Sequence, residues 1–278
     1  MKRKLALTEI KEIELNLLLA FHSFCEENSL QYSLCGGSLL GAIRHNGFIP
    51  WDDDIDVFMP RPDYEKLRLL LSGKCIKEKY YLLDWKTQGE KNEKPLMYYP
   101  FLKLIDLNTE VDAKDVSQKY YTGIWIDIFP IDGLPVSDSD TVRIYKESWF
   151  WRQIFSLHFC KKIIAKGFIQ KLVKLPVLPV AKVMDGQKIC KKLDVLSMTY
   201  DYDSSEFVGG VINGYGPQEK ITKEDLEPVE VIFEGHKVCG MKGYDKYLGN
   251  LYKDYMKLPP EEKRICHGFD AWVIEEEK

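Results

Sequence analysis

The sequence predicts an α+β fold of the mixed α/β type, with helices flanking one small mixed sheet and a basic helical part packed beside it. Two stretches carry this prediction. Residues 35–59 combine a glycine pair, a short helical run and an acidic string that leads into apolar residues, as expected of a helix followed by a buried strand. Residues 123–130 are apolar at nearly every position, which is typical of a central strand buried on both faces.

Composition agrees with a folded globular protein. The 278 residues are 45% hydrophobic, enough for a large core built as one domain with additions or as two modest domains. Charged residues interrupt the apolar positions of the N-terminal segment, so we expect an amphipathic helix there, not a signal peptide or a membrane span. The seven cysteines are scattered without a Cys-x-x-Cys pair, which favours reduced thiols and a cytoplasmic location over a disulfide scaffold or a zinc ribbon.

The elements follow in order from periodicity and from helix-start and helix-stop signals. A helix is expected over residues 8–28, a short strand over 30–34, and a second helix that Ser38 caps and that runs to His45. The acidic string then opens a strand, because it continues directly into apolar residues. The later elements are a helix over 61–71, strands over 80–83, 97–107 and 123–130, helices within 138–200, short strands over 207–212 and 229–239 forming a hairpin or an edge addition, and a helix over 244–255.

Two aspartates of the acidic string are candidate metal ligands. Side chains alternate along a strand, so Asp54 and Asp56 share one face and lie ~7 Å apart. Carboxylates at this distance can share one divalent ion, and four of them within five residues repel one another unless a cation lies among them. The simpler interpretation is an acidic turn capped by aspartate side chains. Asp52 and Asp53 suit such a turn, and Asp52 is the stronger candidate of the two for metal contact.

A third carboxylate, Asp127, stands inside the apolar strand at 123–130. An unpaired buried carboxylate is costly, so we expect a partner for it, either a metal ion or an arginine. Asp132 follows the expected end of that strand, and we assign it to a turn with Gly133.

Phosphate-binding candidates stand close to these carboxylates in the expected fold. Gly37 and Ser38 lie between a strand and a helix, where backbone N–H groups and a hydroxyl can hold an anion. Lys103 interrupts an apolar strand, which has two interpretations: an edge-strand lysine that reaches water, or a cation that contacts a substrate phosphate. Arg44 is a second candidate for stabilising charge on a transferred group.

The stretch GGSLLGAIRHNGFIPWDDDID at residues 36–56 resembles the signature of the LicD family of phosphotransferases, which includes phosphocholine transferases and fukutin-like enzymes. That family resembles nucleotidyltransferases of the DNA polymerase beta type, marked by a Gly-Ser turn followed by an Asp-x-Asp strand. The phrases IDIFPIDGLP at 126–135 and Tyr-Met-x-x-Pro-Pro at 255–260 resemble further family segments. The resemblance covers roughly residues 30–135 and 229–270, and Lys253 stands where the family commonly has glycine.

The resemblance implies a nucleotidyltransferase-like core with two groups of site residues. The catalytic group, which would also hold Mg²⁺ or alternatively Mn²⁺, is Asp54, Asp56 and Asp127. The group expected to contact donor or acceptor is Gly37, Ser38, Arg44, Lys103 and His267. In this scheme metal ions bridge the donor phosphates, while Asp127 orients or deprotonates the acceptor hydroxyl.

The resemblance further implies transfer of phosphocholine from CDP-choline to a sugar hydroxyl of a cell-surface glycan precursor, of the teichoic acid or lipopolysaccharide type, with release of CMP. The partners are then a CDP-linked donor and a lipid-linked glycan acceptor. One alternative is transfer of another phospho-alditol from a CDP carrier, and another is nucleotidyl transfer from a nucleoside triphosphate to a small molecule or sugar. A DxD glycosyltransferase is disfavoured because the chain does not open with repeated strand–helix units. A non-catalytic membrane-bound scaffold is disfavoured because its buried aspartate would be costly.

Three parts of the chain are expected: a catalytic core at 1–137, a basic amphipathic helical subdomain or insertion at 138–200, and a part at 201–278 that completes the core and the acceptor site. Twelve Lys/Arg between Thr141 and Lys192 stand against two acidic residues, so this segment carries +10 and the remainder about −14. Interleaved basic and apolar residues favour peripheral contact with the inner membrane face or a polyanionic acceptor. The alternative is a helical subdomain with a solvated lysine face. Nucleic acid is disfavoured, because the only basic patch is rich in apolar residues.

Overall fold

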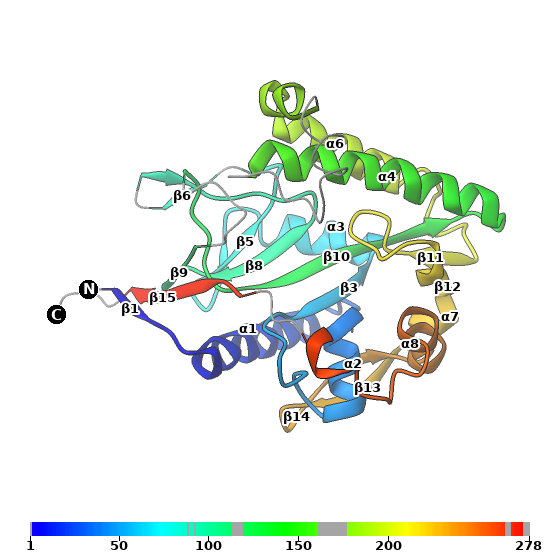
Figure 1. Cartoon of the computed structure of the whole chain (residues 1–278), viewed down its shortest axis with the longest axis horizontal. Coiled ribbons are helices and arrows are strands. Elements are labelled where there is room, and N and C mark those ends of the chain that lie inside the picture. The colour runs from blue at the N-terminus through cyan, green and yellow to red at the C-terminus, as the bar shows by residue number, and fades with distance from the viewer. Residues whose placement is uncertain are drawn as a thin grey trace.

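The computed structural model describes residues 2–87, 89–91, 93–112, 119–160, 177–264 and 268–274. Its central element is the ten-residue strand β10 (Trp125–Leu134), which lies inside an eight-stranded mixed sheet (Figure 1). The side chains of Ile126, Ile128 and Ile131 are fully buried, and their burial explains why this apolar segment takes a central position.

The neighbours of β10 change along its length. Its first half pairs antiparallel with β8 (Leu102–Asp106) and parallel with β3 (Asp56–Pro60), and its last residues pair antiparallel with β11 (Phe207–Gly209). The sheet runs in the order β12-β11-β10-β8-β5-β4, and β2 joins it through β3. The other strands of this sheet are β2 (Ser33–Leu34), β4 (Cys75–Ile76), β5 (Tyr80–Leu83) and β12 (Ile221–Thr222).

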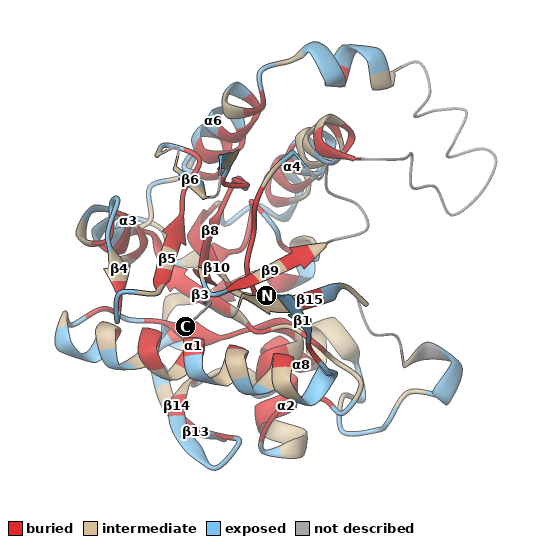
Figure 2. Cartoon of the chain, turned by 90° about the vertical axis from the view of Figure 1, so that its left-hand side faces the viewer, coloured by how far each residue is buried: buried red, intermediate tan, exposed pale blue. Residues whose placement is uncertain are grey.

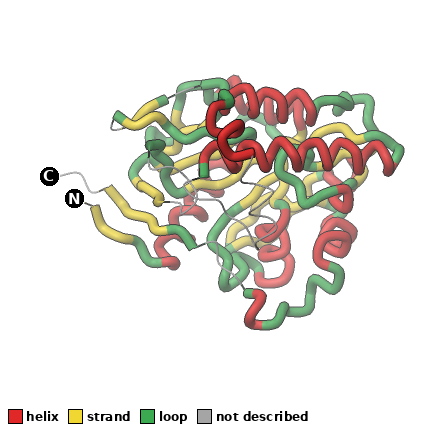
Figure 3. Tube along the Cα trace, turned by 45° about the horizontal axis from the view of Figure 1, so that its top comes forward, coloured by secondary structure: helices red, strands yellow, loops and turns green. Residues whose placement is uncertain are grey.

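Helices cover the sheet on both sides. In Figure 1, α4 (Asp138–Phe159) and α6 (Gly186–Ser197) lie above the strands, and α1 (Leu7–Glu27) and α2 (Gly36–His45) lie below. Buried residues concentrate in the strands between these layers (Figure 2), and Figure 3 shows the long helices running across the strands. The other helices are α3 (Arg61–Leu70), α7 (Lys223–Leu226) and α8 (Tyr244–Tyr252), with 3-10 turns at Pro217–Glu219 and Glu261–Lys263.

Three smaller sheets complete the chain. The first joins β1 (Lys2–Lys4), β15 (Asp270–Ile274) and β9 (Thr109–Asp112), the second is the hairpin β13 (Pro228–Phe233) and β14 (His236–Met241), and the third is β6 (Glu90–Lys91) with β7 (Lys94–Pro95). The hairpin confirms one of the two arrangements expected for the 229–239 segment, and the predicted α+β class is also confirmed.

A buried ion network fastens α6 to the sheet. Arg61, the first residue of α3, donates hydrogen bonds of 2.6 and 2.8 Å to the carboxylate of Asp132 in β10. It also donates to Asp194 and Ser197 of α6, both at 2.8 Å, and all four side chains are buried. The predicted turn at Asp132 is therefore wrong. Strand β10 continues through Gly133 because pairing with β11 and the bond from Arg61 stabilise the extended backbone there.

The basic segment is described only in part. Residues 161–176, with five of its twelve basic residues, lie outside the described residues, so the predicted basic helices can be followed in α4, in the helical residues 177–183 and in α6. Among the helices that the structure describes, none has both the length and the apolar content needed to cross a membrane.

Candidate active site

Three charged side chains form a row across neighbouring strands. In the sheet register, Asp127 of β10 stands opposite Asp56 of β3 on one side and opposite Lys103 of β8 on the other. Residues directly opposite one another in paired strands point to the same face of a sheet, so the two carboxylates and the ammonium group share one face. Asp127 therefore lies on the strand next to the one that follows the acidic string.

Lys103 is the partner of Asp127. Its Nζ lies 2.7 Å from Asp127 Oδ1, and the lysine side chain is almost fully buried. The ammonium group also lies 4.1 Å from the ring centre of Trp125 and 4.4 Å from that of Tyr99, so aromatic faces supply part of its lost hydration. The edge-strand interpretation of Lys103 is wrong, because β8 is paired on both sides, with β10 and β5. The cationic side chain paired with Asp127 is therefore a lysine and not the expected arginine.

The surroundings of Asp56 oppose its ionisation. Burial raises its pKa well above the usual value, and the charges of Asp54 and Asp127 raise it further, while Lys103 lowers it. Asp54 lies two residues before Asp56, immediately ahead of the strand, where it is half-buried. Asp54 and Asp127 are therefore close enough to Asp56 to oppose its ionisation.

The first turn of α2 lies against this acidic group. A Cβ built on Gly37 would lie 2.8 Å from Asp52 Oδ2, so a larger residue at this position would displace the Asp52 side chain. Gly36 has φ of +52°, in the left-handed region that favours glycine. The helix starts at Gly36 with Cys35 as its N-cap, so the predicted capping role of Ser38 is wrong: the Ser38 hydroxyl instead accepts a 2.8 Å hydrogen bond from the backbone N–H of Asp56.

A divalent cation fits this donor set in charge and ligand type. Asp56 and Asp127 are carboxylates on adjacent strands with Asp54 beside them, and hard cations such as Mg²⁺ prefer oxygen ligands. Across the described ranges, however, no group of three or more His, Cys, Asp or Glu side chains is already arranged around one point as metal ligands. Asp127 is instead paired with Lys103. The side chains therefore provide the chemistry for a cation without a preformed three-ligand cage.

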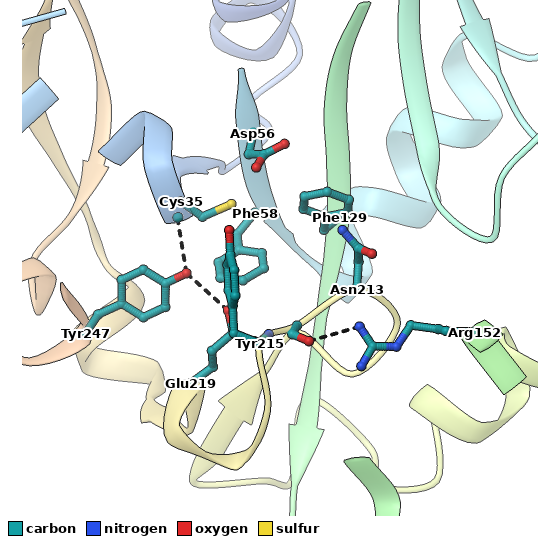
Figure 4. Close-up of a pocket in the computed structure, with 11 residues that line it drawn as sticks. Cys35, Asp56, Phe58, Phe129, Arg152, Asn213, Tyr215, Glu219 and Tyr247 are labelled. Atoms are coloured by element: carbon teal, nitrogen blue, oxygen red, sulfur yellow. Dashed lines mark hydrogen bonds between the residues drawn. The ribbon is translucent and has the colours of Figure 1, made fainter. Parts of the chain in front are cut away.

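A cavity of about 300 Å³ opens beside Asp56 (Figure 4). The ring of Phe129 and the loop that carries Tyr215 form its walls, and Arg152 of α4 and the buried Glu219 line it further from Asp56. The complete lining is Cys35, Gly36, Asp56, Phe58, Phe129, Arg152, Asn213, Gly214, Tyr215, Glu219 and Tyr247. Residues 213 to 219 carry no recognisable motif in the sequence, and their one signal is an aromatic residue between two glycines.

Glu219 holds this side of the cavity together. Its carboxylate accepts a 2.7 Å hydrogen bond from the backbone N–H of Tyr215 and a 3.3 Å bond from the hydroxyl of Tyr247. That hydroxyl also accepts a bond from the N–H of Gly36, which links the loop to the start of α2. Burial raises the pKa of Glu219 to about 8, although these bonds and the charge of Arg152 lower it.

The raised pKa of Glu219 predicts that the difference in unfolding free energy between the wild type and Glu219→Gln depends on pH. In the unfolded chain Glu219 ionises near 4.5, and in the fold near 8, so the wild type loses stability as pH rises through this window. The glutamine keeps an acceptor and has no charge to bury. We expect its unfolding free energy relative to wild type to increase by about 4 kcal/mol between pH 5 and pH 9. Urea unfolding at both pH values measures this, and a difference that stays constant with pH contradicts it.

Two predicted substrate contacts are not found at the row of charges: Arg44 lies at the far end of α2, and His267 is not among the described residues. Arg44 is at the C-terminal end of α2, ~12 Å along the helix from Gly36, where it donates a 2.7 Å hydrogen bond to the carbonyl of Tyr255. The structure thus does not bring Arg44 to the row of charges. His267 lies outside the described residues. Gly268, the next residue described, donates its N–H to Asp53 at 3.0 Å.

A second, more open hollow of about 470 Å³ adjoins the first cavity. The two share Arg152 and Tyr215 in their linings, and the second is walled by Trp149 and Phe150 of α4. These two rings are 57% and 51% exposed, which is unusual for large apolar side chains so close together.

Carboxylates on adjacent parallel strands beside the N-terminus of a helix are the arrangement expected of a transferase of the nucleotidyltransferase type. A family model described as "LicD/FKTN/FKRP, nucleotidyltransferase domain" matches residues 29–178. The chain belongs to this family and is an enzyme of the transferase class. The match includes α4, so it extends beyond the segments whose motifs show the resemblance.

Individual relatives agree with this assignment. The chain is 34% identical over 279 residues to the lipopolysaccharide cholinephosphotransferase LicD of Haemophilus influenzae, with 98% of this chain and 100% of the relative covered. It is 37% identical over 68 residues to the ribitol 5-phosphate transferase FKRP of Homo sapiens, a match that covers 23% of this chain and 14% of that protein.

Proposed function

We propose that this protein transfers phosphocholine from CDP-choline to a sugar hydroxyl of a cell-surface glycan precursor and releases CMP. The observation that carries the proposal is the row of Asp56, Asp127 and Lys103 across three strands, beside a cavity that can hold a small head group. Support for the choice of head group comes from the full-length similarity to a relative named as a lipopolysaccharide cholinephosphotransferase. A lipopolysaccharide-type acceptor is favoured for the same reason, and a teichoic acid precursor is the other acceptor proposed.

The residues have distinct roles in this scheme. Asp54 and Asp56 would hold Mg²⁺, with Mn²⁺ as a substitute, and Asp127 would contact the acceptor hydroxyl with or without touching the metal. The bound ion would neutralise negative charge on the donor phosphates. Asp127 orients the hydroxyl and accepts its proton, and Lys103 fixes the position of that carboxylate. The backbone N–H groups at Gly37 and Ser38 face the donor phosphates at the start of α2.

Metal dependence and donor choice can be measured together. Purified protein is titrated calorimetrically with CDP-choline, CDP-ribitol, CTP and UDP-glucose, each with Mg²⁺ and with EDTA. We expect CDP-choline to bind with Mg²⁺ and to bind at least tenfold more weakly with EDTA, because the diphosphate then meets uncompensated carboxylates.

Each other outcome of that titration points to a different function. Preference for CDP-ribitol keeps the mechanism and changes the transferred group, which the similarity to the ribitol 5-phosphate transferase makes the second candidate. Preference for CTP indicates nucleotidyl transfer, and no nucleotide binding by folded protein contradicts the enzyme proposed here.

We further propose that the enzyme works at the cytoplasmic face of the membrane, in peripheral contact with it, where a lipid-linked acceptor is presented. Trp149 and Phe150 are exposed on α4 next to a hollow that adjoins the cavity, and Lys146 lines the same hollow. Exposed aromatic rings beside basic residues suit an anionic membrane interface.

Vesicle binding tests this surface. The double variant Trp149→Ser, Phe150→Ser is expected to lose most of its sedimentation with vesicles that contain phosphatidylglycerol. Leu69→Ser, on a similarly exposed leucine of α3, serves as the matched control and should sediment like the wild type. Equal sedimentation of the double variant and the control contradicts contact through α4.

A further inference from the structure

We propose that the cavity beside Asp56 is the subsite for the quaternary ammonium of the donor head group, and that the ring of Tyr215 is its main recognition element. This inference rests on the proposed function, since it assigns the part of the site that distinguishes choline from a neutral alditol. The cavity volume of about 300 Å³ is at the small end of the usual range for ligand sites, ~300–1,000 Å³, and suits a head group better than a whole nucleotide.

Four of the eleven residues that line this cavity are aromatic. Phe58, Phe129, Tyr215 and Tyr247 come from four separate parts of the chain and converge on one space (Figure 4). A methylated ammonium ion binds the faces of aromatic rings through the ring quadrupole, and it has no N–H group that would need an acceptor. A polyol such as ribitol needs the opposite kind of pocket, with many hydrogen-bonding groups.

The lining of the cavity also carries more carboxyl groups than cationic groups, which suits a bound cation. Asp56 and Glu219 contribute two carboxyl groups to the lining, and Arg152 is the single guanidinium. Arg152 is turned to the backbone and donates a 2.9 Å hydrogen bond to the carbonyl of Gly214. The attraction between Arg152 and Glu219 does not offset the cost of burying an ionised Glu219, so the pKa of Glu219 stays raised. An entering cation would supply the missing compensation.

The ring of Tyr215 lies close to the carboxylate of Asp56, at the edge of the cavity. An atom placed at the Cβ position of Gly36 would lie 3.6 Å from the Tyr215 ring and 3.7 Å from Asp56 Oδ2, so ring and carboxylate flank one point. A phosphate held at Asp56 therefore places its two-carbon linker and ammonium group next to this ring.

The loop is built to hold an exposed ring in place. Tyr215 is 61% exposed, yet its backbone is fixed on both sides, by the bond from its N–H to Glu219 and by the bond from Arg152 to Gly214. Gly216 follows with φ of +129°, a backbone conformation that favours glycine. A large exposed ring on a loop anchored by buried charged groups indicates binding of a ligand, since core packing does not require it.

Donor discrimination by Tyr215 variants tests the subsite. Affinities for CDP-choline and CDP-ribitol are measured with Mg²⁺ for the wild type, Tyr215→Phe and Tyr215→Leu. Tyr215→Leu should weaken CDP-choline binding about tenfold and CDP-ribitol binding less than twofold, because leucine preserves apolar area and loses the quadrupole. Tyr215→Phe should keep CDP-choline affinity within about threefold of wild type, since phenylalanine retains a ring face.

The outcomes separate this inference from the proposed function. Wild-type protein that binds CDP-choline while Tyr215→Leu weakens both donors equally, or neither, overturns the subsite and leaves the enzyme assignment intact. Wild-type protein that does not bind CDP-choline overturns the proposed donor and the subsite with it. Because Tyr215 is exposed, these variants should fold like the wild type, and circular dichroism of each variant checks this.

Discussion

Replacing Asp56 with asparagine should lower the rate of group transfer about a thousandfold and at the same time raise the melting temperature of the metal-free protein. The activity loss follows because one carboxylate of the cation site is removed, and electrostatic stabilisation of this kind is worth several kcal/mol, with about 4 kcal/mol equal to a thousandfold. The stability gain follows because burial, Asp54 and Asp127 all oppose ionisation of Asp56 in the fold.

The opposite signs make this prediction specific. A residue with a structural role loses activity and stability together, whereas a catalytic residue held under electrostatic strain gains stability when it is neutralised. Transfer rate and thermal unfolding are measured on the same preparation, with Asp203→Asn, at an exposed position, as the control that should change neither. An Asp56→Asn protein that is both inactive and less stable would show that Asp56 supports the fold.

Replacing Arg61 with methionine should destabilise the fold by about 3–5 kcal/mol. Methionine fills a similar space, but Asp132 and Asp194 are then left as buried charges without their partner. Because Arg61 joins the start of α3 to β10 and α6, the loss should appear as a large drop in the urea concentration at the unfolding midpoint.

Arg143→Met is the matched control for this substitution. Arg143 is an exposed residue of α4 whose ion pair with Asp140 is of the i,i+3 type, and removing such a pair typically changes stability by less than about 0.5 kcal/mol. Similar midpoints for the two variants would mean that the Arg61 network contributes specificity of packing and little stability.

The sequence was sufficient where local pattern and burial agree. Asp127 between isoleucines could be assigned to a central strand, because only a strand buried on both faces is apolar on consecutive residues. The strand predicted over 80–83 has its observed bounds, and the helix predicted over 61–71 extends one residue beyond the observed end at Leu70. The apolar spacing of both segments is explained by local pattern without distant contacts.

The features that could not be predicted from the sequence depend on contacts between residues far apart in the chain. Pro130 and Gly133 suggested that a strand ends before Asp132, but pairing with β11, some 75 residues later, extends it. Lys103 had two interpretations because its partner is fixed by sheet register, which the sequence does not display. Tyr215 was missed because a tyrosine between glycines looks like any turn until Asp56 is placed beside it.

The row of charges and the cavity are assembled from widely separated segments, and this affects how the protein folds. The N–H of Gly36 is bonded to the hydroxyl of Tyr247, 211 residues away, so a ribosome-bound chain cannot complete the cavity until most of its length has emerged. Such non-local contacts also slow folding. A donor that binds this cavity recognises only the folded protein. At a donor concentration of a hundred times its Kd, binding should stabilise the native state by about 2.7 kcal/mol.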